Sequence, residues 1–291
     1  MVWWRRLRIT LCLEPDELRL LVVRGQQVES WGRAPLPRGT LRGDVIHNPQ
    51  AIARALQTLW EVHRVPSSRA LVSMPGLQTS VRLVTLPPHE SADNHTALEI
   101  AARFWPTEVS SVAWQVMEHA DRRTLLLLRV PQAVVDRVYT TLGQAGVRVQ
   151  ALEPKPLALL RAVGHAHCVI LDGEPSLATV VIADEAIPLL VSSHPLDVPL
   201  LSTVHDKAIR LAEFLEAAVQ EYNGRGRGRP VDASTPVFCT GALGASPFLR
   251  RLVQEALGYR VADWTPSFPL PPELPQSRYA ANVGLALKHH R

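Results

Sequence analysis

The chain has 291 residues, of which 46% are hydrophobic and 20% are charged, a balance typical of a soluble globular protein with one large or two medium-sized domains. Its formal net charge of +4 is too small to indicate nucleic-acid binding by itself. No stretch of about 18 residues is free of charge, so the sequence predicts no transmembrane helix. Arginines interrupt the apolar N-terminus, unlike the apolar region of a signal peptide.

The three cysteines are far apart, and each lies in an apolar run that is typical of a buried strand: Cys12, Cys168 and Cys239. This placement indicates free thiols in a reducing compartment rather than disulfides or a metal site. The histidines show no metal-ligand spacing, and no grouping of Ser, His, Asp or Cys indicates a catalytic centre. We therefore expect a cytoplasmic protein.

A predicted three-stranded meander opens the chain, with strands at 7–13, 18–23 and 28–31. Asn48 and Pro49 then suit the N-cap and the first position of a helix that ends before Val65. A strand at 70–74 follows. From about residue 83 to 153 the pattern predicts strand–helix–strand–strand–helix–strand, which we interpret as an α+β subdomain inserted into the first half. Its elements are strands at 81–86, 112–118, 124–130 and 147–152, and helices at 91–105 and from 131 up to Gly146.

A second meander begins at Cys168, with strand-like runs at 168–171, at 177–183 and from 186. Its first turn repeats the Glu-Pro pair of the first meander about 160 residues later, which predicts two related halves. The remaining predicted elements are helices at 156–163, 206–222, 247–257 and 280–288, and a strand at 236–240.

Several short segments along nearly the whole chain carry a family resemblance: LRGDVIHNP at 41–49, LVSMPG at 71–76, EIAARFWP at 99–106, AGV at 145–147, LAL at 157–159, FCTG at 238–241 and NVGLAL at 282–287. They resemble segments of the PilM-type type IV pilus assembly proteins, relatives of the cell-division protein FtsA. The resemblance implies an actin-like (duplicated RNase H-like) α/β fold with an inserted α+β subdomain in its first half. On this basis the chain divides into residues 1–82, the insertion 83–153, and the second half 154–291 with a closing C-terminal helix.

Two features depart from that family. The chain is shorter, and the missing part falls between about Pro195 and Asp206, where the family has a smaller subdomain with nucleotide-contacting residues. The resemblance also implies two facing hairpin turns, one per half, that hold phosphates and Mg²⁺ waters. Here both turns contain a proline, Pro15 or Pro175, which has no N–H to donate, and Glu174 adds a negative charge.

The residues that the resemblance assigns to a nucleotide lie in the second turn and after a strand: Asp172, Gly173, Ser176, Gly241 and Gly244. The last two glycines have an alternative role, which is to end the strand and free the next helix. The altered turns favour the remnant of a nucleotide site over a working site for ATP and Mg²⁺, and a non-catalytic protein over an ATPase.

We therefore predict a cytoplasmic scaffold of type IV pilus assembly or of a related secretion machine. The resemblance implies a homo-oligomer, peripheral to the inner membrane, that binds the cytoplasmic N-terminal peptide of a PilN-type membrane protein. That peptide would lie in a groove between the core and the inserted subdomain. The residues predicted along this groove are Val72, Leu83, Leu86, Leu98, Ala102 and Trp105.

Two alternatives are an ATP-dependent switch of the same fold, in which nucleotide closes the two halves, and a basic nucleic-acid-binding module. The second alternative would use Arg225, Arg227 and Arg229, which alternate with glycine. Because no aromatic residues are interleaved with these arginines, a solvated connector is favoured, and we expect no nucleic-acid partner.

Overall fold

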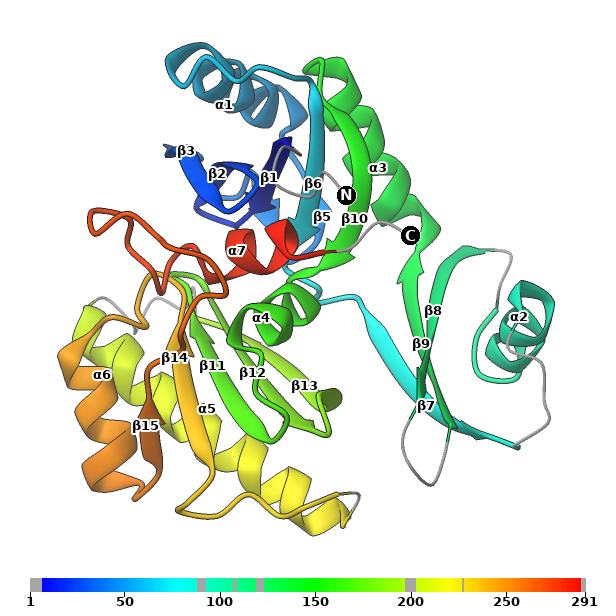
Figure 1. The fold of residues 1–291 in the computed structure, drawn as a ribbon, viewed down its shortest axis with the longest axis vertical. Coiled ribbons are helices and arrows are strands. Elements are labelled where there is room, and N and C mark those ends of the chain that lie inside the picture. The colour runs from blue at the N-terminus through cyan, green and yellow to red at the C-terminus, as the bar shows by residue number, and fades with distance from the viewer. Residues whose placement is uncertain are drawn as a thin grey trace.

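A computed structural model describes residues 7–87, 93–106, 109–118, 123–196, 203–226 and 228–288. It contains two five-stranded sheets, one in each half of the molecule, a three-stranded sheet at one side and a short two-stranded ribbon (Figure 1). Within these ranges, no helix is long and apolar enough to cross a membrane.

The two five-stranded sheets share one topology, with three consecutive antiparallel strands followed by two parallel ones. The first sheet contains, in spatial order, β3 (Gln27–Pro35), β2 (Glu17–Arg24), β1 (Leu7–Leu13), β6 (Arg69–Met74) and β10 (Arg148–Pro154). The second contains β13 (Ile187–Pro195), β12 (Leu177–Asp184), β11 (Cys168–Gly173), β14 (Pro236–Thr240) and β15 (Arg260–Ala262). The prediction of two related halves is therefore confirmed at the level of topology.

The turns that follow the first strand of each half are built alike. The N–H of Leu36 donates to the carbonyl of Asp16 at 2.8 Å, and the N–H of Leu196 donates to the carbonyl of Ser176 at the same distance. The two bonds are about 160 residues apart in the chain, the same spacing as the Glu-Pro repeat of the sequence. The first turn of each meander thus occupies the same place in its half.

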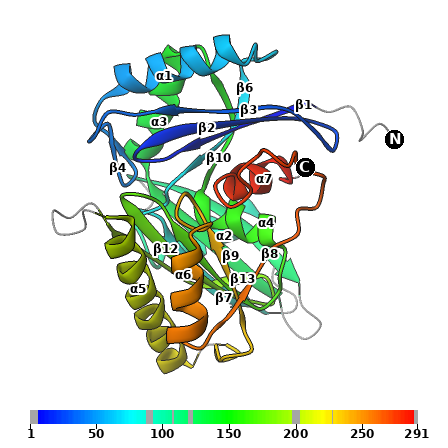
Figure 2. The same cartoon turned by 90° about the vertical axis from the view of Figure 1, so that its left-hand side faces the viewer.

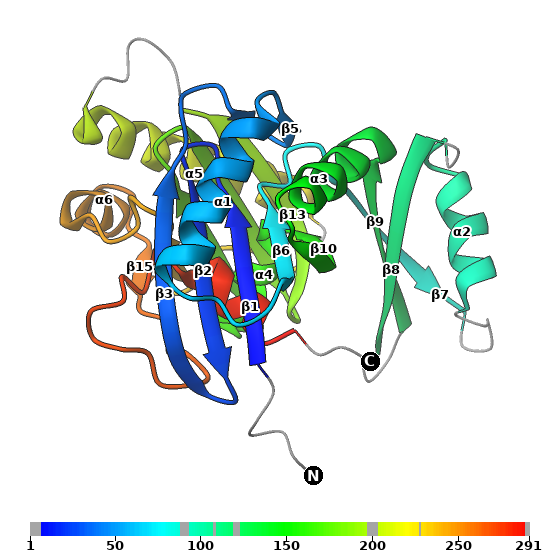
Figure 3. The ribbon, with the colours of Figure 1, turned by 90° about the horizontal axis from the view of Figure 1, so that it is seen from above.

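The sheets and helices form five layers (Figures 1 and 2). The outer helices of the first half, α1 (Pro49–Val62) and α3 (Gln132–Gln144), cover one face of the first sheet, as the view from above also shows for α1 (Figure 3). The outer helices of the second half cover the far face of the second sheet: α5 (Val204–Arg225) and α6 (Pro247–Arg251), which continues as a π-helical turn (Leu252–Ala256).

Two short helices, α4 (Lys155–Val163) and α7 (Ala280–Ala286), form the middle layer between the two sheets (Figure 2). Their backbones approach closely, because a Cβ at Gly284 would lie 1.8 Å from the carbonyl oxygen of Ala158. Asn282 of α7 donates to the carbonyls of Thr10 and Arg19 at 3.2 and 3.0 Å. The apolar core that joins the halves is therefore built around this helix pair.

The three-stranded sheet contains β7 (Ser80–Leu86), β9 (Arg123–Pro131) and β8 (Ser110–Glu118), in that order. Helix α2 (Asn94–Ala102) packs on one of its faces through Ala97, Ile100 and Ala101, and the unit projects from the side of the first half (Figures 1 and 3). The predicted insertion, 83–153, differs at its end. Strand β10 pairs with β6, so β10 and α3 belong to the first five-stranded sheet and its covering layer.

Predicted helix starts agree with the observed caps. The side chain of Asn48 accepts from the N–H of Ala51 at 3.0 Å, and that of Ser246 accepts from Leu249 at 3.4 Å. The ribbon β4 (Leu41–Arg42) and β5 (Val45–Ile46) leads into the first of these helices. The shortened region expected between Pro195 and Asp206 falls largely on residues 197–202, outside the described ranges.

Candidate functional site

The two equivalent hairpin turns meet where the halves touch. Asp16 lies in the turn between β1 and β2, and its carboxylate accepts from the hydroxyl of Ser176, in the turn between β11 and β12, at 2.7 Å. Charged side chains from both turns lie behind this contact and are buried. The interface between the halves therefore contains a polar centre within an otherwise apolar layer.

Lys155, the first residue of α4, lies at the centre of this buried charge cluster. Its ammonium nitrogen is 2.8 Å from Oε1 of Glu14, 2.7 Å from Oδ2 of Asp172 and 2.8 Å from Oε1 of Glu174. Asp172 also accepts from the hydroxyl of Thr240 at 2.8 Å. One cation is thus surrounded by three carboxylates that come from both halves.

Arg19, in the middle of β2, is the second buried cation. Its guanidinium forms a bidentate pair with Glu174, donates to Glu17 at 2.6 Å, and donates to the carbonyl of Arg278 at 2.8 Å. Bidentate guanidinium–carboxylate pairs are among the stronger polar contacts because both hydrogen bonds are charge-assisted. Arg19 and Lys155 therefore join the first half, the second half and the C-terminal segment at one point.

The environment shifts the pKa values of these carboxyls in opposite directions. Burial would raise the pKa of Glu174, but Arg19 and Lys155 outweigh burial and lower it to about 2. Burial raises the pKa of Glu14 to about 7, although Lys155 acts against it. Burial also raises the pKa of Asp172. Two cations, Arg19 and Lys155, thus share a set of buried carboxyls, and Glu174 is the carboxyl that they hold ionised.

The glycines around the cluster pack directly against it. Gly241 has φ +81°, and a Cβ there would lie 2.5 Å from the carbonyl oxygen of Gly173. The same carbonyl accepts from the N–H of Leu243 at 2.8 Å. A Cβ at Gly173 would lie 2.8 Å from a methyl carbon of Leu211 in α5. Backbone and apolar side chains thus fill the space beside the second turn.

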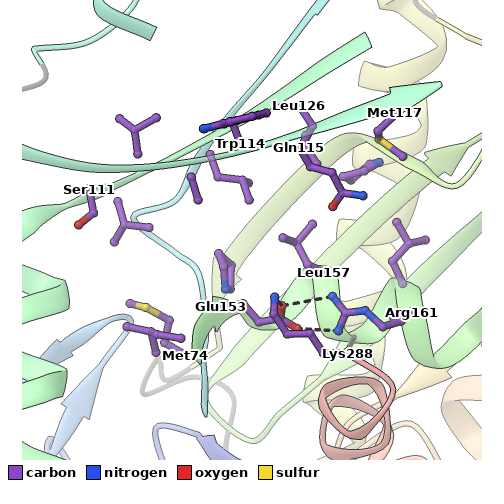
Figure 4. A pocket seen from close by; sticks show the side chains of 18 of the residues that line it. Met74, Ser111, Trp114, Gln115, Met117, Leu126, Glu153, Leu157, Arg161 and Lys288 are labelled. Carbon is purple, nitrogen blue, oxygen red and sulfur yellow. Dashed lines mark hydrogen bonds and ion pairs between the residues drawn. The ribbon is translucent and has the colours of Figure 1, made fainter. Parts of the chain in front are cut away.

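A second candidate site is a cavity of about 660 Å³ between the three-stranded sheet and the core. In Figure 4, Ser111, Trp114, Gln115, Met117 and Leu126 line one side, and Met74, Glu153, Leu157, Arg161 and Lys288 line the other. Strand β8, which contributes the first four of these residues, is an edge strand of its sheet. We call this cavity the side groove.

The core side of the side groove carries a partly buried ion group. Glu153, at the end of β10, is 3% exposed and accepts two hydrogen bonds from Arg161, at 2.8 and 3.2 Å. Lys288 also contacts this carboxylate (Figure 4). The two cations keep about 30% of their side-chain surface exposed. One carboxylate is thus shared by two cations, and the groove has a net positive end.

Comparison with known proteins identifies the fold. No protein-family model and no curated protein matches the sequence. Among solved structures, a chain of a PilM–PilN type IV pilus biogenesis complex matches with a TM-score of 0.77 and 17% identity, covering 97% of this chain and 98% of that one. A Bacteroides thetaiotaomicron protein with an actin-like ATPase fold matches with a TM-score of 0.52 and 8% identity, over 98% and 97% of the two chains. This chain has an actin-like fold.

A third match with the same architecture is the cytoplasmic domain of EpsL, an inner-membrane component of the type II secretion system of Vibrio cholerae. Its TM-score is 0.53 and its identity is 12%, with 98% of this chain and 97% of that chain covered. The actin-like fold that the sequence resemblance implied is therefore confirmed.

The structure brings together the five residues assigned to a nucleotide in the actin-like fold. Asp172 belongs to the charge cluster, Gly173 and Gly241 are in contact, and Ser176 bonds to Asp16. A Cβ at Gly244 would lie 2.5 Å from the carbonyl oxygen of Thr240, so this glycine closes the turn after β14. These residues therefore lie together between the two halves. The groups that contact them are side chains and backbone of the protein itself.

The six residues predicted for a partner lie away from the side groove. Val72 is buried in the first sheet, and Leu86 is buried under α2 with Trp105 packed beside it. Leu98 and Ala102 are exposed on α2, and Leu83 lines a different pocket, between β7 and β13. Four of the six thus lie on or beside α2, whereas the groove is on the opposite face of the sheet.

One feature of the sequence indicates the side groove, namely that strand β9 is apolar on both of its faces. In the uninterrupted apolar run of β9, Leu125 and Leu127 pack toward α2, and Leu126 and Leu128 line the groove. A strand that is apolar on both faces is typically covered on both. Arg19 indicates the charge cluster in the same way. It is a charged residue within the apolar, buried strand β2, and a buried charge is normally paired with an opposite one.

Proposed function

We propose that the chain is an actin-like scaffold protein of type IV pilus assembly or of a related secretion machine. In this role it is cytoplasmic, forms homo-oligomers in the assembled machine and is held at the inner membrane through a partner. The similarity to a chain of a PilM–PilN complex and to EpsL supports the proposal, since both belong to machines of this class. The partner is the cytoplasmic N-terminal peptide of a PilN-type membrane protein.

The observation that carries the proposal is the side groove. Its volume of about 660 Å³ is in the range that proteins use for small ligands and for the anchor side chains of peptides. Its walls are mainly apolar, with Met117 and Leu126 from the small sheet facing Met74 and Leu157 from the core. Apolar side chains of an extended peptide would be removed from water there.

Strand β8 gives the groove a way to hold a backbone as well as side chains. In the described sheet it pairs only with β9, so its other edge offers backbone N–H and C=O groups toward the groove side. An extended peptide can add to such an edge, with hydrogen bonds that supply affinity and pockets that select alternate side chains. Arg161 and Lys288 add donors for a polar or acidic group of the peptide.

The experiment is a titration of the purified protein against a labelled synthetic peptide, the cytoplasmic N-terminal segment of the PilN-type protein of the same genome, followed by fluorescence anisotropy. We expect saturable binding. Leu128→Arg places a charge in the groove wall and should weaken binding at least tenfold, about 1.4 kcal/mol.

The matched control is Leu98→Arg, the same change at a leucine that is 38% exposed on α2, outside the groove. It should leave the affinity unchanged. Equal losses in both variants, or no binding by the unmodified protein, would contradict the proposal. Weaker peptide binding by Leu98→Arg alone would contradict the proposed groove and indicate that the peptide binds on the α2 face.

A further inference from the structure

The actin-like fold raises the question of whether ATP and Mg²⁺ fit between the two halves, and the residues present there do not fit them. We propose instead that the protein's own side chains take the places of the phosphates and of the metal ion, and that they hold the halves together without a ligand. Four features of the interface support this inference, and each concerns residues outside the side groove.

The first feature is the carboxylate of Glu174, which is bound as a phosphate group would be. It lies in the second hairpin turn, 1% exposed, and receives hydrogen bonds from Arg19 and Lys155. It also accepts from the backbone N–H of Ala242, after β14, at 3.3 Å. Cationic side chains and backbone N–H groups are the donors that phosphate sites use. A permanent anion of the chain therefore occupies this set of donors.

The second feature is Lys155, which takes the place of a cation. Three carboxylates surround its ammonium group at 2.7–2.8 Å. Magnesium would require oxygen ligands in octahedral geometry at about 2.0–2.1 Å, and no three His, Cys, Asp or Glu side chains of the described chain are arranged to hold a metal ion. The three carboxylates are thus already paired with Lys155, a cation that is covalently part of the chain.

The third feature is that two consecutive residues of each turn, a glutamate and a proline, offer no free backbone donor. The N–H of Glu14 donates to the carbonyl of Glu17, and that of Glu174 donates to Leu177, so both bonds close their own hairpins. The next residue in each turn is a proline, which has no N–H. These two residues therefore interrupt, in each turn, the run of outward N–H groups with which a phosphate loop holds its anion.

The fourth feature is packing. The carbonyl of Gly173 is bonded to the N–H of Leu243 and lies against Gly241, and Gly173 itself lies against Leu211. A phosphate chain beside the second turn would have to displace these contacts together with the Arg19–Glu174 pair. Since the halves meet through buried groups of both signs, closure is a property of the chain rather than a response to a ligand.

The direct test is calorimetric titration of the unmodified protein with ATP and with ADP, each with Mg²⁺. We expect no binding up to millimolar nucleotide. A dissociation constant below about 100 μM, at which binding is readily measured, would overturn the inference. This test does not involve the side groove or its peptide, so its failure leaves the proposed function standing, and the reverse also holds.

The second test is chemical rescue. Glu174→Ala removes the built-in anion and leaves Arg19, Lys155 and the N–H of Ala242 facing an empty space. The variant should melt at a lower temperature than the unmodified protein, and formate should raise its melting temperature by about 3 °C relative to chloride at equal ionic strength.

The matched control for rescue is Glu29→Ala, which removes the carboxylate of an exposed bidentate pair with Arg24. Formate should not stabilise this variant or the unmodified protein more than chloride does. Absence of rescue in a folded Glu174→Ala variant would overturn the assignment of Glu174 to the anion position. If that variant does not fold, the nucleotide titration of the unmodified protein decides alone.

Discussion

Replacing Lys155 by Met is the change that tests the charge cluster most severely. Lys155 is 3% exposed, and its loss leaves three buried carboxylates with Arg19 as the remaining buried cation. Removing one partner of a buried ion pair typically costs about 3–5 kcal/mol. Because a protein of this kind is stable by about 5–15 kcal/mol, Lys155→Met should lose a large share of its free energy of unfolding.

The loss should depend on pH in a defined direction. Without Lys155, the pKa values of Glu14 and Asp172 rise further, because the lysine charge is the largest of the effects that lower them. A carboxyl whose pKa is raised in the folded state favours folding at low pH and loses that contribution as the pH rises through the folded pKa. The deficit of the variant should therefore be largest near pH 8 and smaller near about pH 5.5.

The measurement is urea unfolding of both proteins at these two pH values, with the free energy extrapolated to water. The control is Lys288→Met, since Lys288 is about 30% exposed and its partner Glu153 keeps Arg161. The control should lose about 1 kcal/mol or less at either pH. A Lys155→Met deficit below about 1 kcal/mol, or one independent of pH, would refute the reasoning.

Three further outcomes are expected. Glu14→Gln removes a carboxyl whose pKa rises from its ordinary value of 4.5 to about 7 on folding. The stability of the variant relative to the unmodified protein should therefore rise by up to about 3 kcal/mol from pH 4.5 to 8 in urea unfolding. Gly241→Ala should destabilise by more than about 2 kcal/mol, and the control Gly258→Ala, with φ +73° and open space around it, by about 1 kcal/mol. Burial raises the pKa of each thiol to about 11 or 12, so thiol reagents at pH 8 should label the folded protein slowly and the unfolded protein fully, at Cys12, Cys168 and Cys239.

The duplicated architecture could be predicted because local patterns specify it. The Glu-Pro turns recur at a constant spacing, and the caps Asn48 and Ser246 mark helix starts through short-range hydrogen bonds. The assignment of β10 was beyond local reasoning. Its residues are compatible with either the three-stranded or the five-stranded sheet. Its parallel partner β6 is far away in the chain, so tertiary packing decides the pairing.

The charge cluster was only half predictable. The altered turns favoured the remnant of a nucleotide site over a working one, because Pro15 and Pro175 are visible in the sequence. The cluster itself was not visible, since Lys155 is at the start of a helix, where a cation is normally unfavourable, and nothing local relates it to Arg19. Its position is explained only by three carboxylates brought together by folding.

One short piece of backbone belongs to both candidate sites. The side chain of Glu153 lines the side groove, and that of Lys155, two residues later, lies in the charge cluster. Pro154, between them, restricts the backbone. A ligand in the groove that shifts this segment changes the energy of the cluster, and thermodynamic reciprocity makes the cluster change the affinity of the groove by the same factor. If the groove binds its peptide and the halves close without nucleotide, as proposed above, occupancy of the groove alters the stability of the junction between the halves.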